Sequence, residues 1–378
     1  MASYKVGRYD YPAQFTDLDG ELLPAIRQTL LRGDYVLGAA VARFEDALAG
    51  FLGVRHAIGI NSGTDALILA LHALGIGTGD QVITVANTFH ATAQAIERVG
   101  ATPVIVDCHP DDYLIDLAEV ETAITERTKA AIVVHLFGQA VDMRAVTDLA
   151  QRHGLLVLED CAQAIGARSN GIRVGTISQA GCWSFAPSKN LAAAGDGGAV
   201  TLNDDNVAER LRLLRHFGQR RQNVHRTVGY NSRLDTLQAL VLEHKLPRVD
   251  EWNAQRSMLA EQYRTRLAGL PVSFQEGAGD GEHVYHLFQM RTEPRAALGA
   301  HLQGLGIDAV IRYPFPIHLQ EAFAHLGYKR GDFPVSEDLA ETTLCLPLFP
   351  SMTSAQVDLV CDGVIGFFAG GGRHSTRS

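Results

Sequence analysis

Features that mark special classes of protein are scarce or missing in this chain. Its 378 residues include only five cysteines, scattered and without a Cys-x-x-Cys pair, which excludes a disulfide scaffold and gives no pattern for a metal site. No stretch approaches the roughly 18 consecutive apolar residues of a membrane span. Basic residues are not in excess, because 33 Lys and Arg stand against 42 Asp and Glu, for a net charge of −9. We therefore expect a reduced cytoplasmic protein with buried thiols and no metal, nucleic-acid or membrane partner.

The opening residues also lack a recognisable targeting signal. The stretch MASYKVGRYDYPAQF is polar and aromatic, without the charged-then-apolar order of a signal peptide. What remains is an ordinary globular composition, 46% hydrophobic and 20% charged, in a chain long enough for two or three structural units.

Between about residues 57 and 200, short apolar runs alternate with amphipathic stretches. This alternation predicts strands joined by crossover helices, and hence an α/β fold with a mostly parallel central sheet sandwiched by helices. Ligands of such sheets bind beyond the carboxyl ends of the strands. The expected strands are 57–61, 82–86, 103–106, 131–134, 155–158 and 182–185, and the expected helices are 64–74, 91–99, 117–124 and 143–153.

The second half of the chain predicts a smaller α+β domain. Helices are expected over 204–217 and 235–244, and Pro247 then marks a boundary. A long polar helix follows Arg248, then a strand-like run over 284–291 and a helix over 295–305. We therefore expect a large domain at 1–247, a smaller one at 248–369, and a disordered tail at 370–378.

Three local features carry chemical information, and the first is the stretch NSGTDAL at 61–67. Small residues here join an apolar strand to an amphipathic helix. A helix N-terminus presents unpaired N–H groups and the positive end of the helix dipole, which suits a phosphate. The alternative is a simple helix cap, with Thr64 or Asp65 satisfying the first turn.

The second feature is Asp160, in EDCAQA at 159–164. It follows the buried run 155–158, so it falls where α/β folds build their sites. A carboxylate buried there needs a cationic or hydrogen-bonding partner, and a protonated pyridine nitrogen would be one. The alternative is an aspartate that caps a helix.

The third feature is Lys189, in SFAPSKN at 184–190. It follows a strand and a proline turn and enters a small-residue loop that ends in the GDGG run at 195–198. A lysine nucleophile must lose its proton, so its pKa must fall from about 10.4 through burial or a neighbouring cation. The alternative is an exposed surface lysine. The glycine run lacks the GxGxxG spacing of a nucleotide fingerprint.

Together, a helix-terminus phosphate site, a strand-end carboxylate and a loop lysine are the parts that a pyridoxal-phosphate (PLP) site requires. The chain also resembles the DegT/StrS-type nucleotide-sugar aminotransferases of PLP fold type I over nearly its whole length. The stretches that carry this resemblance are GDYVLG (33–38), NSGTDAL (61–67), LGIGTGDQVIT (74–84), ANTFHAT (86–92), VHLFGQAVDM (134–143), EDCAQAIGA (159–167), SFAPSKN (184–190), GDGGAV (195–200) and GYNSRLDTLQA (229–239).

The resemblance implies a role for individual residues. Lys189 would form the Schiff base with PLP and move the proton between cofactor and substrate carbons, while Asp160 would keep the pyridine nitrogen protonated. The remaining implied contacts are Gln163 to the phenolic oxygen, Phe89 on the ring face, Gly63, Thr64 and Ser184 to the phosphate, Asn231 to the phosphate of the neighbouring subunit's cofactor, and Tyr313 and His318 to the sugar. Arg233 is expected to be structural or to form the interface. The active unit implied is a homodimer.

Two departures from the family bear on the substrate. Ala186 stands where relatives carry an aromatic residue, and the opening VGRYDYPAQF differs from the usual start. Dehydratases in the family carry histidine at the lysine position, so Lys189 favours transamination.

The implied reaction moves the amino group of L-glutamate, through pyridoxamine phosphate, to a nucleotide-linked 3-keto or 4-keto 6-deoxyhexose. The stretches SGTDAL and NSRLDTLQA resemble 3-aminotransferases more closely and so favour the 3-keto form. The expected nucleotide is dTDP. The product would feed an antibiotic sugar or a surface polysaccharide. Three alternatives stay open: a cyclitol (keto-inositol) aminotransferase, a PLP-dependent sugar dehydratase, and a non-catalytic sensor on the same fold.

Overall fold

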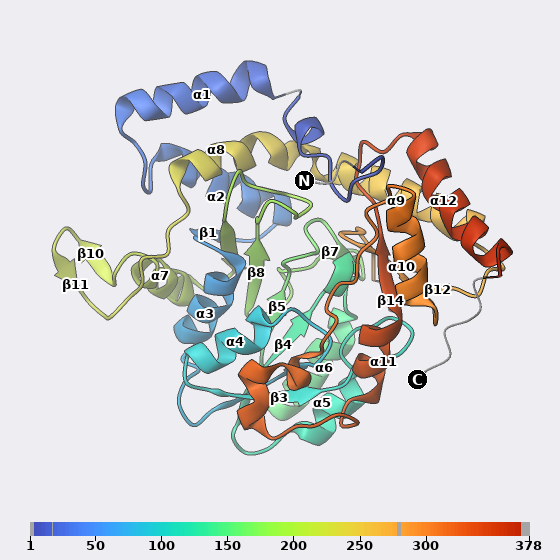
Figure 1. The fold of residues 1–378 in the computed structure, drawn as a ribbon. Helices are drawn as coiled ribbons and strands as arrows, with labels where there is room; N and C mark the ends of the chain where they lie inside the picture. Colours follow the sequence, from blue (N-terminus) through green and yellow to red (C-terminus); the bar gives the residue numbers. More distant parts are fainter. Residues whose placement is uncertain (1–3, 17, 278–280, 372–378) are drawn as a thin grey trace.

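The computed structural model describes residues 4–16, 18–277 and 281–371, and a seven-stranded sheet lies at its centre (Figure 1). The strand order is β1-β9-β8-β5-β4-β2-β3. Strand β9 runs antiparallel to both of its neighbours, and the other pairs are parallel. The strands are β1 (His56–Ile60), β2 (Gln81–Val85), β3 (Thr102–Val106), β4 (Thr128–Val134), β5 (Leu156–Asp160), β8 (Ala180–Ser184) and β9 (Gly198–Leu202).

Helices cover both faces of this sheet, because successive strand residues point to opposite sides. Ala130 and Ile132 of β4 join a core with α3, α4 and α7, whereas Ala131 and Val133 join a core with α5 and α6. Helices α2 and α8 pack over β1, β8 and β9 on the second face. The predicted α/β class is confirmed. The helices are α1 (Asp19–Arg32), α2 (Ala39–Leu52), α3 (Gly63–Ala73), α4 (Ala91–Arg98), α5 (Leu117–Ala123), α6 (Met143–His153), α7 (Asp205–Leu214) and α8 (Thr236–Lys245).

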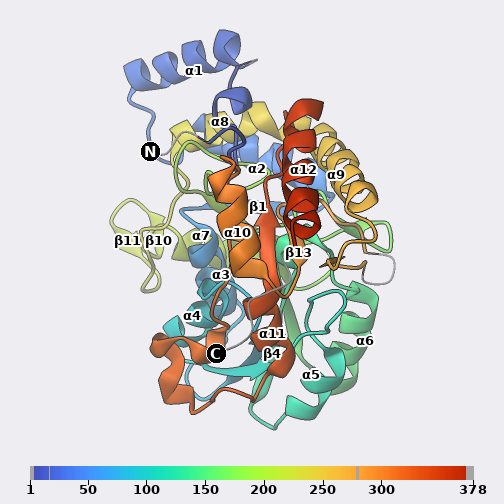
Figure 2. The same ribbon diagram turned by 45° about the vertical axis from the view of Figure 1, so that its right-hand side comes forward.

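Two elements stand out from the rest of the molecule in both views (Figures 1 and 2). Helix α1 lies outside α8, and the hairpin of β10 (Gln219–Arg221) and β11 (Val224–His225) projects beyond α7. Both carry exposed apolar side chains: Leu31 of α1 is 67% exposed, and Val224 of β11 is 40% exposed. A second, smaller hairpin joins β6 (Arg168–Ser169) and β7 (Ile172–Arg173).

The C-terminal elements form their own core beside the central sheet. A three-stranded antiparallel sheet, in the order β12-β13-β14, packs with α9, α10 and α12. Val6, near the start of the chain, is buried in this core and pairs with Ile307. The elements of this core are α9 (Val249–Arg266), β12 (Ser273–Phe274), β13 (Phe288–Arg291), α10 (Arg295–Gly304), β14 (Thr343–Leu346) and α12 (Ser354–Ala369), whereas α11 (Pro334–Thr342) packs through Leu339 with the core around α5 and α6.

Some expectations from the sequence stay predictions. These are the domain division at 247/248, the cytoplasmic location and the disordered tail, most of which lies outside the described residues. No helix in the described ranges combines the length and apolarity needed to cross a membrane. All five cysteine thiols are buried and unpaired, as expected.

Two strands differ from the expectation. Strand β9 begins inside the glycine-rich run at Gly198, where a Cβ would lie 2.5 Å from the carbonyl carbon and oxygen of Ser62. Glycine is therefore needed there by close packing and does not signal a loop. The strand-like run 284–291 forms a strand only from Phe288, because Val284 and Leu287 donate instead to the carbonyls of Gly138 and Phe137.

Candidate active site

A cavity of about 310 Å³ opens at the carboxyl ends of the central strands. Residues that follow β1, β2, β5 and β8 line it, together with two segments from the C-terminal part of the chain. Eight of the ten predicted site residues line this cavity: Gly63, Thr64, Phe89, Asp160, Gln163, Ser184, Lys189 and Tyr313. The fold therefore brings together residues that lie up to 250 positions apart in the sequence.

The N-terminus of α3 forms one wall of the cavity. Ser62 caps the helix by accepting a hydrogen bond from the backbone N–H of Asp65 at 3.1 Å. The alternative cap by Thr64 or Asp65 is therefore wrong, and the Asp65 carboxylate instead accepts from Ser232 Oγ at 2.6 Å. A Cβ on Gly63 would lie 2.6 Å from that of Ser184, so only glycine lets the helix end approach this strand end. The first-turn N–H groups of α3 have no intrahelical partners and suit an anion.

Asp160 ends β5 with its carboxylate turned into the protein, and its side chain is 7% exposed. Thr92 Oγ1 donates to it at 2.9 Å, and the backbone N–H of Ala162 donates at 3.1 Å. Burial raises the pKa of this carboxyl above its ordinary value, although those donors and the charges of Lys189 and His135 partly oppose the rise. No helix follows β5, so the capping alternative is wrong. A cationic partner would offset the free-energy cost of burying this carboxylate.

Lys189 lies in a loop that folds back on itself between β8 and β9. The backbone N–H groups of Phe185 and Ala193 donate to Gly197 and Phe185 across this loop. The pKa of Lys189 is lowered to about 8, mainly by burial; the charge of Asp160 opposes this decrease, and that of Arg312 adds to it. An ammonium group with a pKa of about 8 loses its proton far more readily than an ordinary lysine, and a lysine nucleophile must be deprotonated. The alternative of a fully exposed lysine does not hold.

Gln163 and Tyr313 form a fixed pair beside Lys189 in the same cavity. Gln163 Nε2 donates to the Tyr313 hydroxyl at 2.7 Å, and its Oε1 accepts from the Phe137 N–H at 2.7 Å. Tyr313 has a φ of 52°, and its ring lies 5.9 Å from that of Phe137 and 6.2 Å from that of Phe89. Burial raises the pKa of Tyr313 well above its ordinary value, so its hydroxyl keeps its proton.

Two predicted residues lie away from this cavity. His318 is 2% exposed, its Nε2 lies 2.9 Å from a Glu337 oxygen, and Phe333 packs edge-on against its ring. Such a buried pair leaves the His318 ring unavailable to a sugar in this cavity. Asn231 is exposed, forms an isolated β-bridge with His216, and is not among the residues that line this cavity.

Arg312 and His286 also line the cavity, and the sequence did not single them out. Arg312 Nη2 donates to the Tyr9 hydroxyl at 2.6 Å, which ties the opening segment to the cavity wall. Its position directly before Tyr313 was the available signal. His286 lies within the run 284–291, whose apolar pattern predicts a strand and gives no sign of a site residue.

A cluster of His135, Glu159 and Cys161 lies buried behind Asp160. Glu159 accepts hydrogen bonds from the N–H groups of Gly175, Ile177 and Ser178, from Ser178 Oγ and from His135 Nε2. The Val141 N–H donates to His135 Nδ1 at 3.0 Å. The ligand atoms of this histidine and carboxylate are thus already engaged by protein donors, and the cluster serves to support the end of β5.

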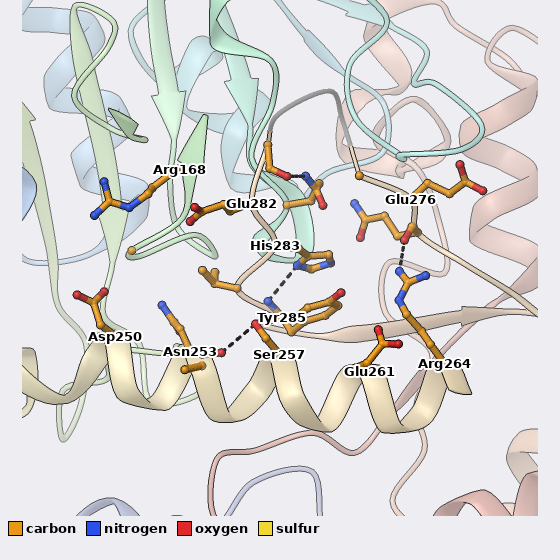
Figure 3. Close-up of a pocket in the computed structure, with 17 residues that line it drawn as sticks. Arg168, Asp250, Asn253, Ser257, Glu261, Arg264, Glu276, Glu282, His283 and Tyr285 are labelled. Atoms are coloured by element: carbon orange, nitrogen blue, oxygen red, sulfur yellow. Dashed lines mark hydrogen bonds between the residues drawn. The ribbon is translucent and has the colours of Figure 1, made fainter. Parts of the chain in front are cut away.

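A larger, more polar cavity of about 860 Å³ lies along α9 (Figure 3). Asp250, Asn253, Ser257, Glu261 and Arg264 line it from the helix, and the segment that contains His283 and Tyr285 lies opposite. None of the ten predicted site residues lines this cavity. The smaller cavity is therefore the candidate active site.

Comparison with known proteins identifies the family of this chain. Residues 16–365 match the model of the DegT/DnrJ/EryC1/StrS aminotransferase family. A dTDP-3-amino-3,4,6-trideoxy-alpha-D-glucose transaminase of Streptomyces venezuelae is 46% identical over 94% of each chain. A "pleiotropic regulatory protein" of Geobacillus stearothermophilus is 43% identical over 95% of this chain and 97% of that one. The crystal structure of S. venezuelae DesV with a ketimine intermediate superposes with a TM-score of 0.94, at 45% identity, covering 96% of this chain and 98% of that one.

Proposed function

The chain belongs to the DegT/DnrJ/EryC1/StrS family of PLP-dependent aminotransferases, and from this premise we propose that it transfers the amino group of L-glutamate to a nucleotide-linked keto sugar. The acceptor proposed is a dTDP-linked 3-keto-6-deoxyhexose. The observation that carries the proposal is one cavity in which Lys189, with a lowered pKa, lies close enough to Asp160 for the two charges to interact. The 46% identity to a dTDP-sugar transaminase supports the choice of acceptor.

The residues of this cavity fit PLP. The N-terminus of α3 at Gly63 and Thr64, with Ser184, would hold the phosphate, and the buried Asp160 would meet the ring nitrogen. Gln163 keeps a second N–H for the phenolic oxygen, since only one is used on Tyr313. Phe89 would cover the ring face. When bound, PLP accepts the amino group and takes up the electrons of the broken C–H bond.

The chain's own groups divide the remaining work. Lys189, with a pKa near 8, can hold or release a proton at neutral pH, which suits a group that moves the proton between carbons. Asp160 keeps the ring nitrogen protonated. Tyr313, kept protonated by burial, fixes Gln163 and limits water at the cavity wall. Ala186 also lines the cavity, and its small side chain leaves room on the substrate side.

A homodimer is proposed as the active unit, with Asn231 reaching the partner's cofactor phosphate. Three features support this assembly: Asn231 is exposed, α1 and the β10–β11 hairpin project from the body, and both elements carry exposed apolar side chains. Leu23 is 57% exposed and Leu31 is 67% exposed on α1. An apolar face of this kind is typical of an interface between copies.

Mixed dimers provide a direct test of Asn231. Each of the variants Lys189→Ala and Asn231→Ala is expected to be impaired alone. A dimer with one chain of each kind should contain one intact site, because the Lys189 of one chain then meets the Asn231 of the other. Unfolding and refolding the two variants together should therefore restore up to about a quarter of the wild-type rate, since half of randomly formed dimers are mixed. Recovery no better than the sum of the separate variants would contradict a contact between subunits.

The reaction itself is tested with the PLP-loaded protein. Addition of L-glutamate should bleach its yellow colour and release 2-oxoglutarate, and a dTDP-3-keto-6-deoxyhexose should then leave with a new amino group. The panel should include 4-keto sugars, UDP-linked sugars and keto-inositols. Amination of a keto-inositol alone would favour the cyclitol alternative. Loss of a sugar hydroxyl without gain of nitrogen would identify a dehydratase. Bound PLP without turnover would indicate a sensor, a possibility raised by the regulatory name of one relative.

A further inference from the structure

A chain of buried hydrogen bonds runs from α9 to the wall of the active-site cavity. Asn253 Nδ2 donates to the Ile165 carbonyl at 2.8 Å. Asn190 Nδ2 donates to Asn253 Oδ1 at 2.9 Å and to the Val284 carbonyl at 3.0 Å. Asn190 Oδ1 lies 3.2 Å from His286 Nδ1. Asn190, Asn253 and His286 are each at most 7% exposed.

This chain of hydrogen bonds through Asn253, Asn190 and His286, called the relay below, is compatible with only one placement of its protons. A backbone carbonyl can only accept, so the bonds to Ile165 and Val284 fix the nitrogen side of both amides. The oxygen of Asn190 must then face His286. An amide oxygen also only accepts, so His286 Nδ1 carries a proton and donates it to Asn190. A neutral imidazole has one N–H, and Nε2 is therefore an acceptor with a free lone pair.

The surroundings of His286 keep its ring neutral. Burial holds the pKa of His286 well below its ordinary value, and the positive charges of Lys189, Arg256 and Arg312 and the neighbouring His283 act in the same direction. His286 lines the active-site cavity together with Lys189, Arg312 and Tyr313. In the described part of the chain, no group donates a hydrogen bond to Nε2. A fixed acceptor without a partner thus lies at the wall of the cavity, where a substrate binds.

This acceptor distinguishes the two proposed substrates. The carboxylates of L-glutamate are ionised at neutral pH and have no hydrogen to donate, and its amino group is the one transferred. A sugar ring instead presents hydroxyl groups that can donate. We infer that His286 Nε2 accepts a hydrogen bond from a ring hydroxyl of the nucleotide-linked sugar, and that Asn190 and Asn253 act as positioning residues which fix its tautomer. This inference rests on the proposed function.

The position of Asn253 explains how the relay is held. It lies on α9 between Asp250 and Ser257, at the wall of the larger cavity (Figure 3). The relay therefore joins a rigid helix of 18 residues to a loop segment at the active site. Such support from a packed element is what a precisely oriented specificity residue requires.

Kinetics of the two half-reactions test the sugar contact. His286→Leu should lower the ratio of kcat/KM for the sugar to kcat/KM for L-glutamate by roughly tenfold, mainly through a higher KM for the sugar. This ratio is called the sugar-to-glutamate ratio below. His286→Gln should recover most of this ratio, because its amide oxygen can reach the position of Nε2. His283→Leu is the matched control, since it removes a nearby imidazole that lies outside the active-site cavity and should leave the ratio as in wild type.

Nitrogen-15 NMR of histidine-labelled, PLP-loaded protein tests the relay without reference to activity. The His286 signals should show a protonated Nδ1 and no titration between pH 6 and 8. Asn190→Ala should shift the tautomer toward a protonated Nε2 and lower the sugar-to-glutamate ratio as well. A protonated Nε2 in wild type, or an unchanged ratio in His286→Leu, overturns the inference. A wild type that releases no 2-oxoglutarate overturns the proposed function, and the sugar assignment with it.

Discussion

Replacement of Lys189 by alanine is expected to lower the rate of amino transfer by roughly 10⁴-fold while the protein remains folded. The side chain lines a cavity and forms no hydrogen bond with another described residue, whereas the backbone N–H of Lys189 donates to the Ala186 carbonyl. What the variant loses is an amine whose pKa, about 8, lies near the working pH. Proton transfer is most efficient when the group's pKa lies near that pH.

The lowered pKa also predicts a pH dependence. Below about pH 8 the Lys189 side chain is mostly an ammonium ion, which cannot attack a carbonyl, and above it the amine is mostly neutral. The rate at which the cofactor-free protein captures PLP should therefore rise through about pH 8. An ordinary exposed lysine would show this rise only near pH 10.4.

The measurement is the visible absorbance that develops when PLP is added to cofactor-free protein over a range of pH. Lys189→Ala should develop no yellow colour, and Lys189→Arg is the matched control because a guanidinium keeps its positive charge but does not deprotonate in this range. A yellow product in Lys189→Ala, or a wild type that stays colourless, would refute the assignment of Lys189.

The part of this site that lies at the carboxyl ends of the central strands can be predicted from the sequence. Asp160 and Lys189 come just after apolar runs, and the carboxyl ends of parallel strands meet at one edge of a sheet. Their proximity can therefore be anticipated from the chain alone. Residues that reach the cavity from the C-terminal part have no such marker. Gln163 and Tyr313 are bonded across 150 residues, and only the packing of two cores brings them together.

His286 shows a second limit of sequence interpretation. Its neighbours Val284, Leu287 and Phe288 are apolar, so the run reads as a strand whose side chains are buried. The strand begins only at Phe288 because the preceding backbone bonds to the loop at Phe137 and Gly138. Tertiary hydrogen bonds override the local pattern here, and they do so at the active-site cavity.

Gly198 is a further position that the sequence does not explain. Its close packing against Ser62, which requires a glycine, involves residues far apart in the chain and cannot be inferred from the local pattern.

Replacement of Asp160 by asparagine is expected to have opposite effects on activity and on the stability of the cofactor-free protein. Its two hydrogen bonds can be kept: the amide oxygen can accept from Ala162, and Thr92, which also contacts Thr88 at 3.2 Å, can turn its hydroxyl to accept. The negative charge is lost. Removal of one member of a buried charge pair costs about 3–5 kcal/mol, so the rate and the retention of PLP should fall by roughly 10²- to 10⁴-fold.

The stability effect follows from the raised pKa of the Asp160 carboxyl. Burial lifts the pKa in the folded protein above its value in the unfolded chain. Between these two pKa values the folded state binds more protons, so stability falls as the pH rises and stays reduced at neutral pH. An asparagine carries no such penalty. Cofactor-free Asp160→Asn should therefore melt at a higher temperature than wild type at pH 7, and this advantage should disappear at pH values below both pKa values.

Calorimetry of the cofactor-free proteins, beside the rates of the loaded ones, checks both effects. Asp196→Asn provides the matched control, because Asp196 lines the same cavity but is exposed, so that burial does not penalise its charge. Its melting temperature should equal that of wild type. A lower melting temperature in Asp160→Asn would mean that the carboxylate serves the fold more than the cofactor. A higher one, with the rate reduced, would identify Asp160 as a buried charge kept for its cationic partner.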